Sequence, residues 1–363
     1  MNKPFKLEDI PFEETLAEEP EVPPIRDIVA RDPASRETAH LHWFRHTKDG
    51  FLNTIFHVVL KHCPDWFVSE IGRALVPLVR WSYRKKIFPS RIERNFAILT
   101  RGLWHDPAQE KRALNRWWQN IGRTISEFCI VNDLWKDARI SVEGIEHLEA
   151  ARRTGRPLIF TSMHLGTWEA LFVAIHDGLA GPSIGPFQPE PNRFKNRIVH
   201  AIRRKRDQYL FPPGQRSAYR LHRLMKTGRY SMTIFIDEVR DKQVHLPLFG
   251  RKAPDRGNAV VAAKIANACD GVLVPTYLKR TGPARFKLVI LPAIQGQDAT
   301  TGYDVGKTIK ALNDVFEPIV LGHIEEWYML GELRLPKNFE QGTFSKSLAE
   351  ANTQRRLNEA GNP

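Results

Sequence analysis

The chain has 363 residues, of which 42% are hydrophobic and 26% carry a charge. This composition can bury a substantial core, so disorder over the whole length is excluded and one large domain, with or without a helical appendage, is expected. The three cysteines, Cys63, Cys129 and Cys269, lie far apart without a CxxC pair. That spacing argues against a disulfide framework and a structural zinc site, and it favours a reducing, cytosolic environment.

Positive charge is unevenly distributed along the chain. Lys and Arg number 54 against 41 Asp and Glu, a formal net charge of +13. Residues 1–40 hold 5 basic and 10 acidic side chains and sum to −5, so the remainder carries +18. Such a surplus predicts an anionic partner, which composition alone leaves open among nucleic acid, an acidic carrier protein and phospholipid headgroups.

The two ends of the chain look unstructured. Residues 1–40 combine acidic pairs with Pro20, Pro23 and Pro24, and they contain too little apolar surface to offset chain entropy. We therefore predict a disordered acidic leader over 1–40 and a flexible tail over 338–363. An acidic, proline-rich start is also unlike a secretory signal peptide.

Residues 41–140 are predicted to be helical. Apolar residues recur at helical spacing and are followed by a basic cluster. The apolar set is Phe51, Leu52, Ile55, Phe56, Val59, Leu60, Trp66, Phe67, Ile71, Leu75, Leu78, Val79 and Trp81, and the basic set is Arg80, Arg84, Lys85 and Lys86. This pattern fits helices that lie in a membrane interface, and it equally fits a helical hairpin packed on the protein's own core. No apolar run of about 18 residues predicts a transmembrane helix. A further helical region is expected over 108–135.

Residues 141–337 are predicted to form an α/β domain. Short apolar runs alternate with polar helical stretches, which favours a mostly parallel central sheet flanked by helices. We predict strands at 158–163, 182–185, 230–237, 271–278 and 286–291, and helices near 168–179, 193–206, 217–227 and 256–269.

The segment from His164 to Glu169 is the candidate catalytic site. A buried strand ends at Met163, Gly166 permits a tight turn, and Thr167 is a plausible N-cap for the next helix. A corner of this kind can bring His164 and Glu169 within hydrogen-bonding reach. On its own the spacing is a weak signal. Its position at the carboxyl end of a strand strengthens it, because α/β sheets place their sites there.

A histidine and a carboxylate can activate a hydroxyl that the substrate supplies. The imidazole acts as general base, and the carboxylate fixes its tautomer and stabilises the imidazolium that forms. The sequence contains no GxSxG nucleophile elbow. Direct attack by a substrate hydroxyl needs no such elbow.

The run His164-Leu-Gly-Thr-Trp-Glu169 resembles the HFGNWE-type signature of the late acyltransferases of bacterial lipid A biosynthesis, the lauroyl and myristoyl transferases. These belong to the lysophospholipid acyltransferase superfamily, whose motif is HX4D/E. The resemblance covers most of the chain. It includes Arg94-Asn95-Phe96, Gly122-Arg123, Glu127, Val142-Glu143-Gly144, Phe187-Gln-Pro-Glu-Pro-Asn192, Ile236-Asp237-Glu238, Pro247-Leu-Phe-Gly250 and Glu326-Trp327-Tyr328. Glu238 stands where the family usually has glutamine.

The resemblance implies a glycerol-3-phosphate acyltransferase-like fold with an N-terminal membrane-associating region. It implies that His164 is the base and Glu169 its orienting partner. The expected donor is acyl carrier protein or acyl-CoA, and the expected acceptor is a hydroxyl of a membrane glycolipid or related lysolipid. The expected location is the cytoplasmic face of the bacterial inner membrane, and neither a metal nor a cofactor is expected.

Four further residues are candidates for substrate binding: Asn192, Arg203, Arg204 and Asp237. Asn192 also fits a turn, and Asp237 also fits a helix cap. The two arginines lie in residues 193–229, where twelve Lys or Arg accompany the single acid Asp207. Such a run is compatible with a solvated helix face or with a docking surface for a phosphorylated or acidic partner.

Two rival functions remain open at this stage. One is a nucleic-acid-binding protein, suggested only by the basic surplus and lacking helix-turn-helix, zinc-finger and RNA-binding signatures. The other is a catalytically inert lipid-binding relative, against which the His164 and Glu169 pair argues.

Overall fold

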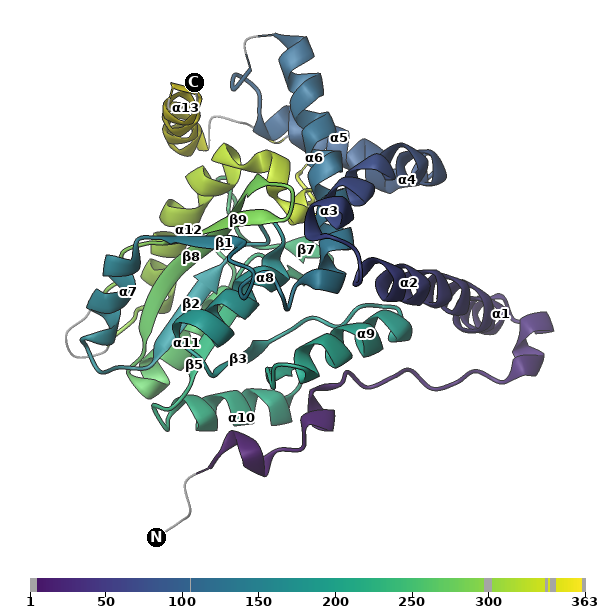
Figure 1. Ribbon diagram of the computed structural model, residues 1–363, viewed down its shortest axis with the longest axis horizontal. Helices are drawn as coiled ribbons and strands as arrows, with labels where there is room; N and C mark the ends of the chain where they lie inside the picture. The colour runs from purple at the N-terminus through teal and green to yellow at the C-terminus, as the bar shows by residue number, and fades with distance from the viewer. Residues whose placement is uncertain (1–4, 105, 297–301, 337–338, 340–343, 361–363) are drawn as a thin grey trace.

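A seven-stranded sheet forms the centre of the protein in the computed structural model, which describes residues 5–360 except 105, 297–301, 337–338 and 340–343 (Figure 1). In spatial order the strands are β1 (Ile140–Glu143), β9 (Arg285–Ile290), β8 (Val272–Gly282), β2 (Leu158–Ser162), β5 (Ser231–Phe235), β3 (Ser183–Pro186) and β4 (Leu210–Phe211). Neighbouring strands are parallel except for the β8–β9 hairpin. The predicted mostly parallel sheet and its five predicted strands are confirmed. A separate two-stranded ribbon joins β6 (Val239–Arg240) to β7 (Gln243–Val244).

Helices cover both faces of the sheet. Along β2, Ile159 enters one apolar cluster while Leu158 and Phe160 enter the other, as the alternation of a strand requires. The Ile159 side packs on α10 (Gln215–Met225), α11 (Asn258–Cys269) and α12 (Val305–Gly322). The opposite side packs on α7 (Ile145–Arg152), α8 (Trp168–Val173) and α9 (Arg193–Arg204). Because both faces are covered, the central strands are fully buried and read as continuous apolar runs.

The region preceding the sheet consists of helices, as predicted. These are α1 (Pro33–His40), α2 (His46–Leu60), α3 (Asp65–Ala74), α4 (Val76–Tyr83), α5 (Ile87–Leu99) and α6 (Pro107–Glu127). Gly72 of α3 and Gly122 of α6 face each other so closely that a methyl group on either would collide with the other's carbonyl oxygen. Glycine at both positions therefore allows α3 to dock directly on α6, which in turn contacts the sheet domain.

Many apolar side chains of α2–α5 remain exposed. Phe51, Trp66, Leu78, Trp81 and Ile87 are each more than half exposed, Ile87 reaching 77%. No helix within the described part of the chain is both long and apolar enough to span a bilayer. The opposite side of these helices packs on the protein, as Val68, Ile92 and Phe96 are buried. Membrane association of this region stays a prediction.

The structure does not support the predictions for the chain ends. Residues 7–30 contain short 3₁₀ helices, and Leu7, Ile10 and Phe12 are buried against the sheet domain. The leader was predicted to be disordered because these few apolar residues seemed too sparse, whereas they pack on side chains far away in the sequence. In the predicted tail, α13 (Ser345–Ala360) packs on α12. Within that tail, residues 338, 340–343 and 361–363 lie outside the described residues.

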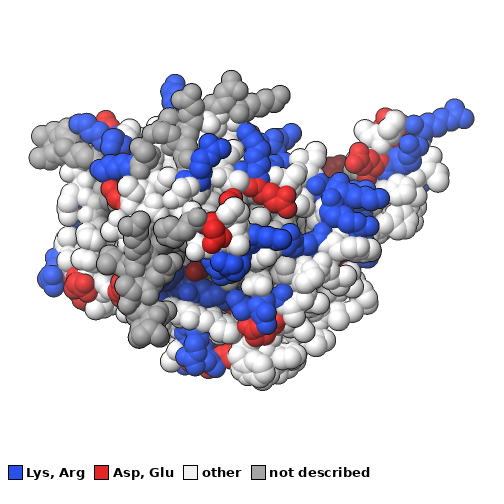
Figure 2. All heavy atoms as spheres, turned by 90° about the horizontal axis from the view of Figure 1, so that it is seen from above, with Lys and Arg blue, Asp and Glu red and all other residues white. Residues whose placement is uncertain are grey.

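Figure 2 shows how charged side chains are distributed over one face of the molecule. On the face seen from above in Figure 2, Lys and Arg side chains form several separate groups interspersed with Asp, Glu and uncharged surface.

Candidate active site

The carboxyl ends of two neighbouring parallel strands bring His164 and Asp237 together. β2 and β5 pair in the register Ser162 with Phe235. His164 and Asp237 each follow two residues later, so they continue the same register beyond the strand ends. The Nδ1 atom of His164 lies 2.7 Å from Oδ1 of Asp237. Asp237 was predicted to bind substrate, and in the structure its direct partner is the histidine.

Asp237 is held by three hydrogen bonds. Besides the contact with the His164 ring, its Oδ2 accepts from the backbone N–H of His164 at 2.9 Å and from the indole Nε1–H of Trp327 at 2.9 Å. Asp237 and Trp327 are both fully buried. A buried carboxylate with three donors is fixed in orientation, and it holds the histidine ring in a single position.

One nitrogen of His164 is left for chemistry. Because Nδ1 faces a carboxylate, the neutral ring carries its proton on Nδ1 and presents an unprotonated Nε2. The His164 side chain is 16% exposed. Phe235 and Trp168 flank its ring, with centroids 4.4 and 5.4 Å away. The imidazole is thus oriented from behind by Asp237 and confined at its sides, which is the arrangement of a general base.

The turn after His164 is clamped by α6 and β8. Gly166 has a φ of +56°, and a Cβ there would lie 3.2 Å from the carbonyl oxygen of Leu278, so glycine suits this position. Thr124 of α6 donates its hydroxyl to the carbonyl of Gly166 at 3.1 Å. The amide of Tyr328 donates to the carbonyl of His164 at 2.9 Å.

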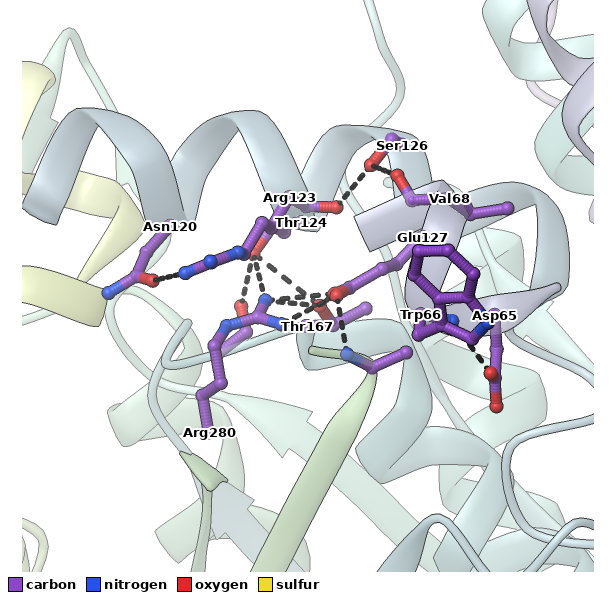
Figure 3. A network of polar contacts seen from close by, with 12 residues as sticks. Asp65, Trp66, Val68, Asn120, Arg123, Thr124, Ser126, Glu127, Thr167 and Arg280 are labelled. Atoms are coloured by element: carbon purple, nitrogen blue, oxygen red, sulfur yellow. Dashed lines mark hydrogen bonds and ion pairs between the residues drawn. The ribbon is translucent and has the colours of Figure 1, made fainter. Parts of the chain in front are cut away.

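A buried ion pair completes the clamp, and Figure 3 shows its contacts. Arg280 of β8 binds both oxygens of Glu127 at 2.5 and 2.8 Å. Thr167 donates its hydroxyl to Glu127 at 2.5 Å. Thr167 does stand at the start of α8, but its side chain bonds to α6 and makes no cap on the helix. The catalytic turn is therefore positioned by contacts to two elements more than thirty residues away.

The expectation that Glu169 would orient His164 is wrong in this structure. The carboxylate of Glu169 turns to α9 and the residues after it, where Arg203 binds both of its oxygens at 2.9 and 3.0 Å and Arg206 binds Oε1 at 2.7 Å. The first turn of α8 directs Glu169 away from the strand end, into a fully buried position. Asp237 fills the place predicted for Glu169.

Two carboxyl groups near the site have shifted pKa values in opposite directions. Burial by itself disfavours the charged form of Glu169, but Arg203 and Arg206 outweigh it and lower the pKa of Glu169 to about 2. Burial raises the pKa of Glu238 to about 8, although its Oε1 accepts the Asn258 amide at 2.5 Å. At neutral pH Glu169 is an anion and Glu238 is mostly a neutral acid, so Glu238 resembles the glutamine usual at that position.

The other predicted substrate-binding residues have structural partners. Asn192 caps α9, accepting from the amide of Phe194 at 2.9 Å, and its side chain donates to the carbonyl of His46 at 3.1 Å. Arg203 is engaged by Glu169, and its guanidinium lies 4.8 Å from the ring of Phe187. Arg204 points to the outside of α9 and pairs with Glu13. Of these three, Arg203 is brought to the catalytic turn.

The sequence did not predict the role of Trp327. This residue belongs to the segment Glu326-Trp327-Tyr328, which was noted as a motif without a function. Its position, ninety residues beyond Asp237 in the chain, offers no local signal of the contact. Within the described residues, no group of three or more His, Cys, Asp or Glu side chains could hold a metal ion.

One known protein family matches the chain over most of its length. The sequence profile described as bacterial lipid A biosynthesis acyltransferase matches residues 38–334, well over half of the chain. The chain belongs to this family. The matched range includes His164, Asp237 and Trp327, so the whole pair and its support lie within it. Membership implies an acyltransferase that acts on a lipid. None of the curated proteins that were compared with the chain matches it.

Proposed function

We propose that this protein is an O-acyltransferase that moves a fatty acyl group from a thioester, on acyl carrier protein or coenzyme A, to a hydroxyl of a lipid A-type glycolipid or a related lysolipid. The observation that supports this most strongly is the His164–Asp237 pair at the carboxyl ends of β2 and β5, with Nε2 of the histidine unengaged by any described residue. A base in this form is suited to removing a proton from an alcohol.

In the proposed reaction, Nε2 of His164 takes the proton of the acceptor hydroxyl as its oxygen attacks the thioester carbonyl carbon. The tetrahedral intermediate then collapses, the carbon–sulfur bond breaks, and the leaving thiolate takes the proton back from the imidazolium. Asp237 stabilises the imidazolium while it exists. No serine or cysteine of the protein forms a covalent intermediate in this scheme.

Glu169 has a positioning role in the proposal. By binding both oxygens to Arg203 and Arg206, it fixes two cations beside the start of α8. Both arginine side chains are nearly buried, with 10% and 5% exposed, and Glu169 supplies the counter-charge that their guanidinium groups need there. The motif glutamate thereby ties the start of α8 to α9 and the residues after it, and so helps to hold the catalytic turn in place.

We further propose that α2–α5 rest on the cytoplasmic face of the bacterial inner membrane. The exposed aromatic and aliphatic side chains and the adjoining Arg80, Arg84, Lys85 and Lys86 support this, since such a surface favours an anionic lipid interface. Trp81→Gln should weaken cosedimentation with vesicles that contain anionic phospholipid. Ile145→Gln, which removes an exposed apolar side chain from α7, is the matched control and should leave cosedimentation unchanged.

Lipid profiling by mass spectrometry tests the function in the cell. Cells that lack the gene should accumulate a lipid one acyl chain short of its normal form, and reintroducing the gene should restore it. Identical lipid profiles with and without the gene would contradict the proposed activity.

A further inference from the structure

An acidic segment at the N-terminus lies along the basic helices α9 and α10. This segment, residues 7–21, is here termed the acidic strap. It contains seven of the chain's acidic side chains and no basic one: Glu8, Asp9, Glu13, Glu14, Glu18, Glu19 and Glu21. In Figure 1 the strap passes beneath α10 and α9 before the chain reaches α1. It therefore covers the most basic stretch of the protein, residues 193–229.

The strap binds this stretch through specific ion pairs. Glu19 binds Arg197 of α9 through both carboxylate oxygens, at 2.6 and 2.7 Å. Glu13 lies 3.0 Å from Arg204. Glu14 pairs with Arg216 and Arg220 on α10, the former at 2.9 Å. Three carboxylates thus neutralise arginines on two successive helices, and the bidentate pair gives the contact directionality.

An aromatic side chain that directly precedes the paired glutamates also anchors the strap. Phe12 is 8% exposed, and its ring lies 4.9 Å from His200 and 5.0 Å from Tyr209. Tyr209 also donates its hydroxyl to the carbonyl of Ile10 at 3.2 Å. The α9–α10 face thus accommodates an acidic polypeptide that inserts an aromatic residue.

Helix α9 connects this face to the active site. Arg203, near the end of the helix, turns inward and binds the buried Glu169, whereas Arg197 and Arg204 turn outward to the strap. Whatever occupies the outer face is separated from Glu169 by the thickness of one helix, about 10 Å. A partner docked there would therefore lie one helix away from Glu169, which belongs to the helix that follows the catalytic turn.

We propose that the face formed by Arg197, His200, Arg204, Arg216 and Arg220 is a docking surface for an acidic protein, and that the acidic strap is its intramolecular competitor. The proposal rests on the proposed function in one respect: the acidic protein is taken to be the carrier that delivers the acyl thioester. Binding of the carrier then requires the strap to leave, and both compete for the same arginines.

A protein partner fits this face better than a membrane does. Among the described residues of α9 and α10, Tyr219 is the one large hydrophobic side chain that is mostly exposed. The exposed apolar side chains gather instead on α2–α5. A surface that is rich in arginine and poor in exposed apolar side chains suits carboxylate partners, because interfacial membrane binding needs apolar insertion.

The test compares affinities for phosphopantetheinylated acyl carrier protein, measured by fluorescence anisotropy with the full chain. The variant Glu13→Gln/Glu14→Gln/Glu19→Gln weakens the strap but keeps its apolar anchors. The matched control is Glu143→Gln/Glu146→Gln/Glu149→Gln. It makes the same change in net charge at β1 and α7, where β1 forms the edge of the sheet opposite β4. We expect the strap variant to bind at least five-fold more tightly than wild type and the control to stay within two-fold. Adding Arg197→Glu and Arg204→Glu to the strap variant should abolish the gain.

Three results would overturn the docking proposal: no gain in carrier affinity for the strap variant, an equal gain for the control, or a gain in binding to anionic phospholipid vesicles in place of the carrier. The proposed function is tested separately, by transfer from acyl-CoA, which needs no carrier protein. Histidine-dependent transfer from acyl-CoA without a gain for the strap variant would refute the docking surface alone. If the strap variant gains affinity for the carrier but acyl transfer does not depend on His164, the proposed chemistry alone is refuted.

Discussion

Replacing Asp237 by asparagine should remove the base without changing the shape of the site. Oδ2 of Asp237 accepts from two donors, the His164 amide and the Trp327 indole, so the oxygen of asparagine must take that position. Its amide NH₂ group then faces Nδ1 of His164 and donates to it. The histidine is forced to carry its proton on Nε2, where it can no longer accept one from the substrate.

The expected loss is large because the tautomer itself becomes wrong. The equivalent change in a serine protease triad lowers kcat by about 10⁴, which corresponds to about 5 kcal/mol in the activation barrier. We therefore expect Asp237→Asn to lower the rate of acyl transfer by about 10³ to 10⁴. Thiol release from the thioester, with the lipid acceptor present, gives the rate, and thermal unfolding reports whether the fold is retained.

Glu238→Gln is the matched control for this variant. It makes the same chemical change one residue later, at a carboxyl group that is mostly neutral at pH 7 because burial raises its pKa to about 8. The rate of acyl transfer by this variant should stay within about three-fold of wild type, whereas loss of a general base lowers a rate by about 10²–10⁴. A folded Asp237→Asn protein with more than a tenth of the wild-type rate would refute the tautomer argument, as would equal losses in the two variants.

Three further predictions follow from the same contacts. Trp327→Phe removes one charge-assisted hydrogen bond to Asp237, worth about 1.5–3 kcal/mol, so kcat should fall about 10- to 100-fold; an unchanged kcat would contradict it. Glu127→Gln leaves Arg280 buried without its counter-charge. In a denaturant titration it should lower the free energy of unfolding by about 3–5 kcal/mol. A loss below about 1 kcal/mol would show that the ion pair does not hold the turn. The pKa of Glu238 is higher in the folded protein than its ordinary value of 4.5, so the free energy of unfolding should decline as the pH rises from about 4.5 through about 8. Glu238→Gln should remove that decline. The variant should then be more stable than wild type at pH 9 by on the order of 1–4 kcal/mol and similar to it near pH 4.

The parts of the fold with a strong local pattern were predictable. The apolar run 158–162 and the turn at Gly166 indicate a strand that leads into a corner, and the structure has both. The strands β1 and β4 were missed: β4 has two residues, too few for a visible alternation, and in β1 only Ile140 is buried. The helix α12 was also missed, although its N-cap Asp304 is of an ordinary type.

The partner of His164 depended on strand order, which a single sequence does not reveal. Glu169 is five residues away and was the obvious acid, whereas Asp237 is 73 residues away and becomes a neighbour only because β5 lies beside β2. The strap was misjudged for a similar reason. Its ion pairs with Arg197 and Arg204 connect segments about 180 to 190 residues apart, so its composition predicted disorder while its contacts hold it in place.

The central claim, that His164 is the base in acyl transfer to a lipid, is tested most directly by His164→Ala. The purified variant is supplied with acyl thioester and lipid acceptor, and the acylated lipid is quantified by mass spectrometry alongside thermal unfolding. We expect a folded protein whose transfer rate has fallen by at least about 100-fold, the lower end of general-base contributions. A folded variant that retains more than about a hundredth of the wild-type rate would contradict it.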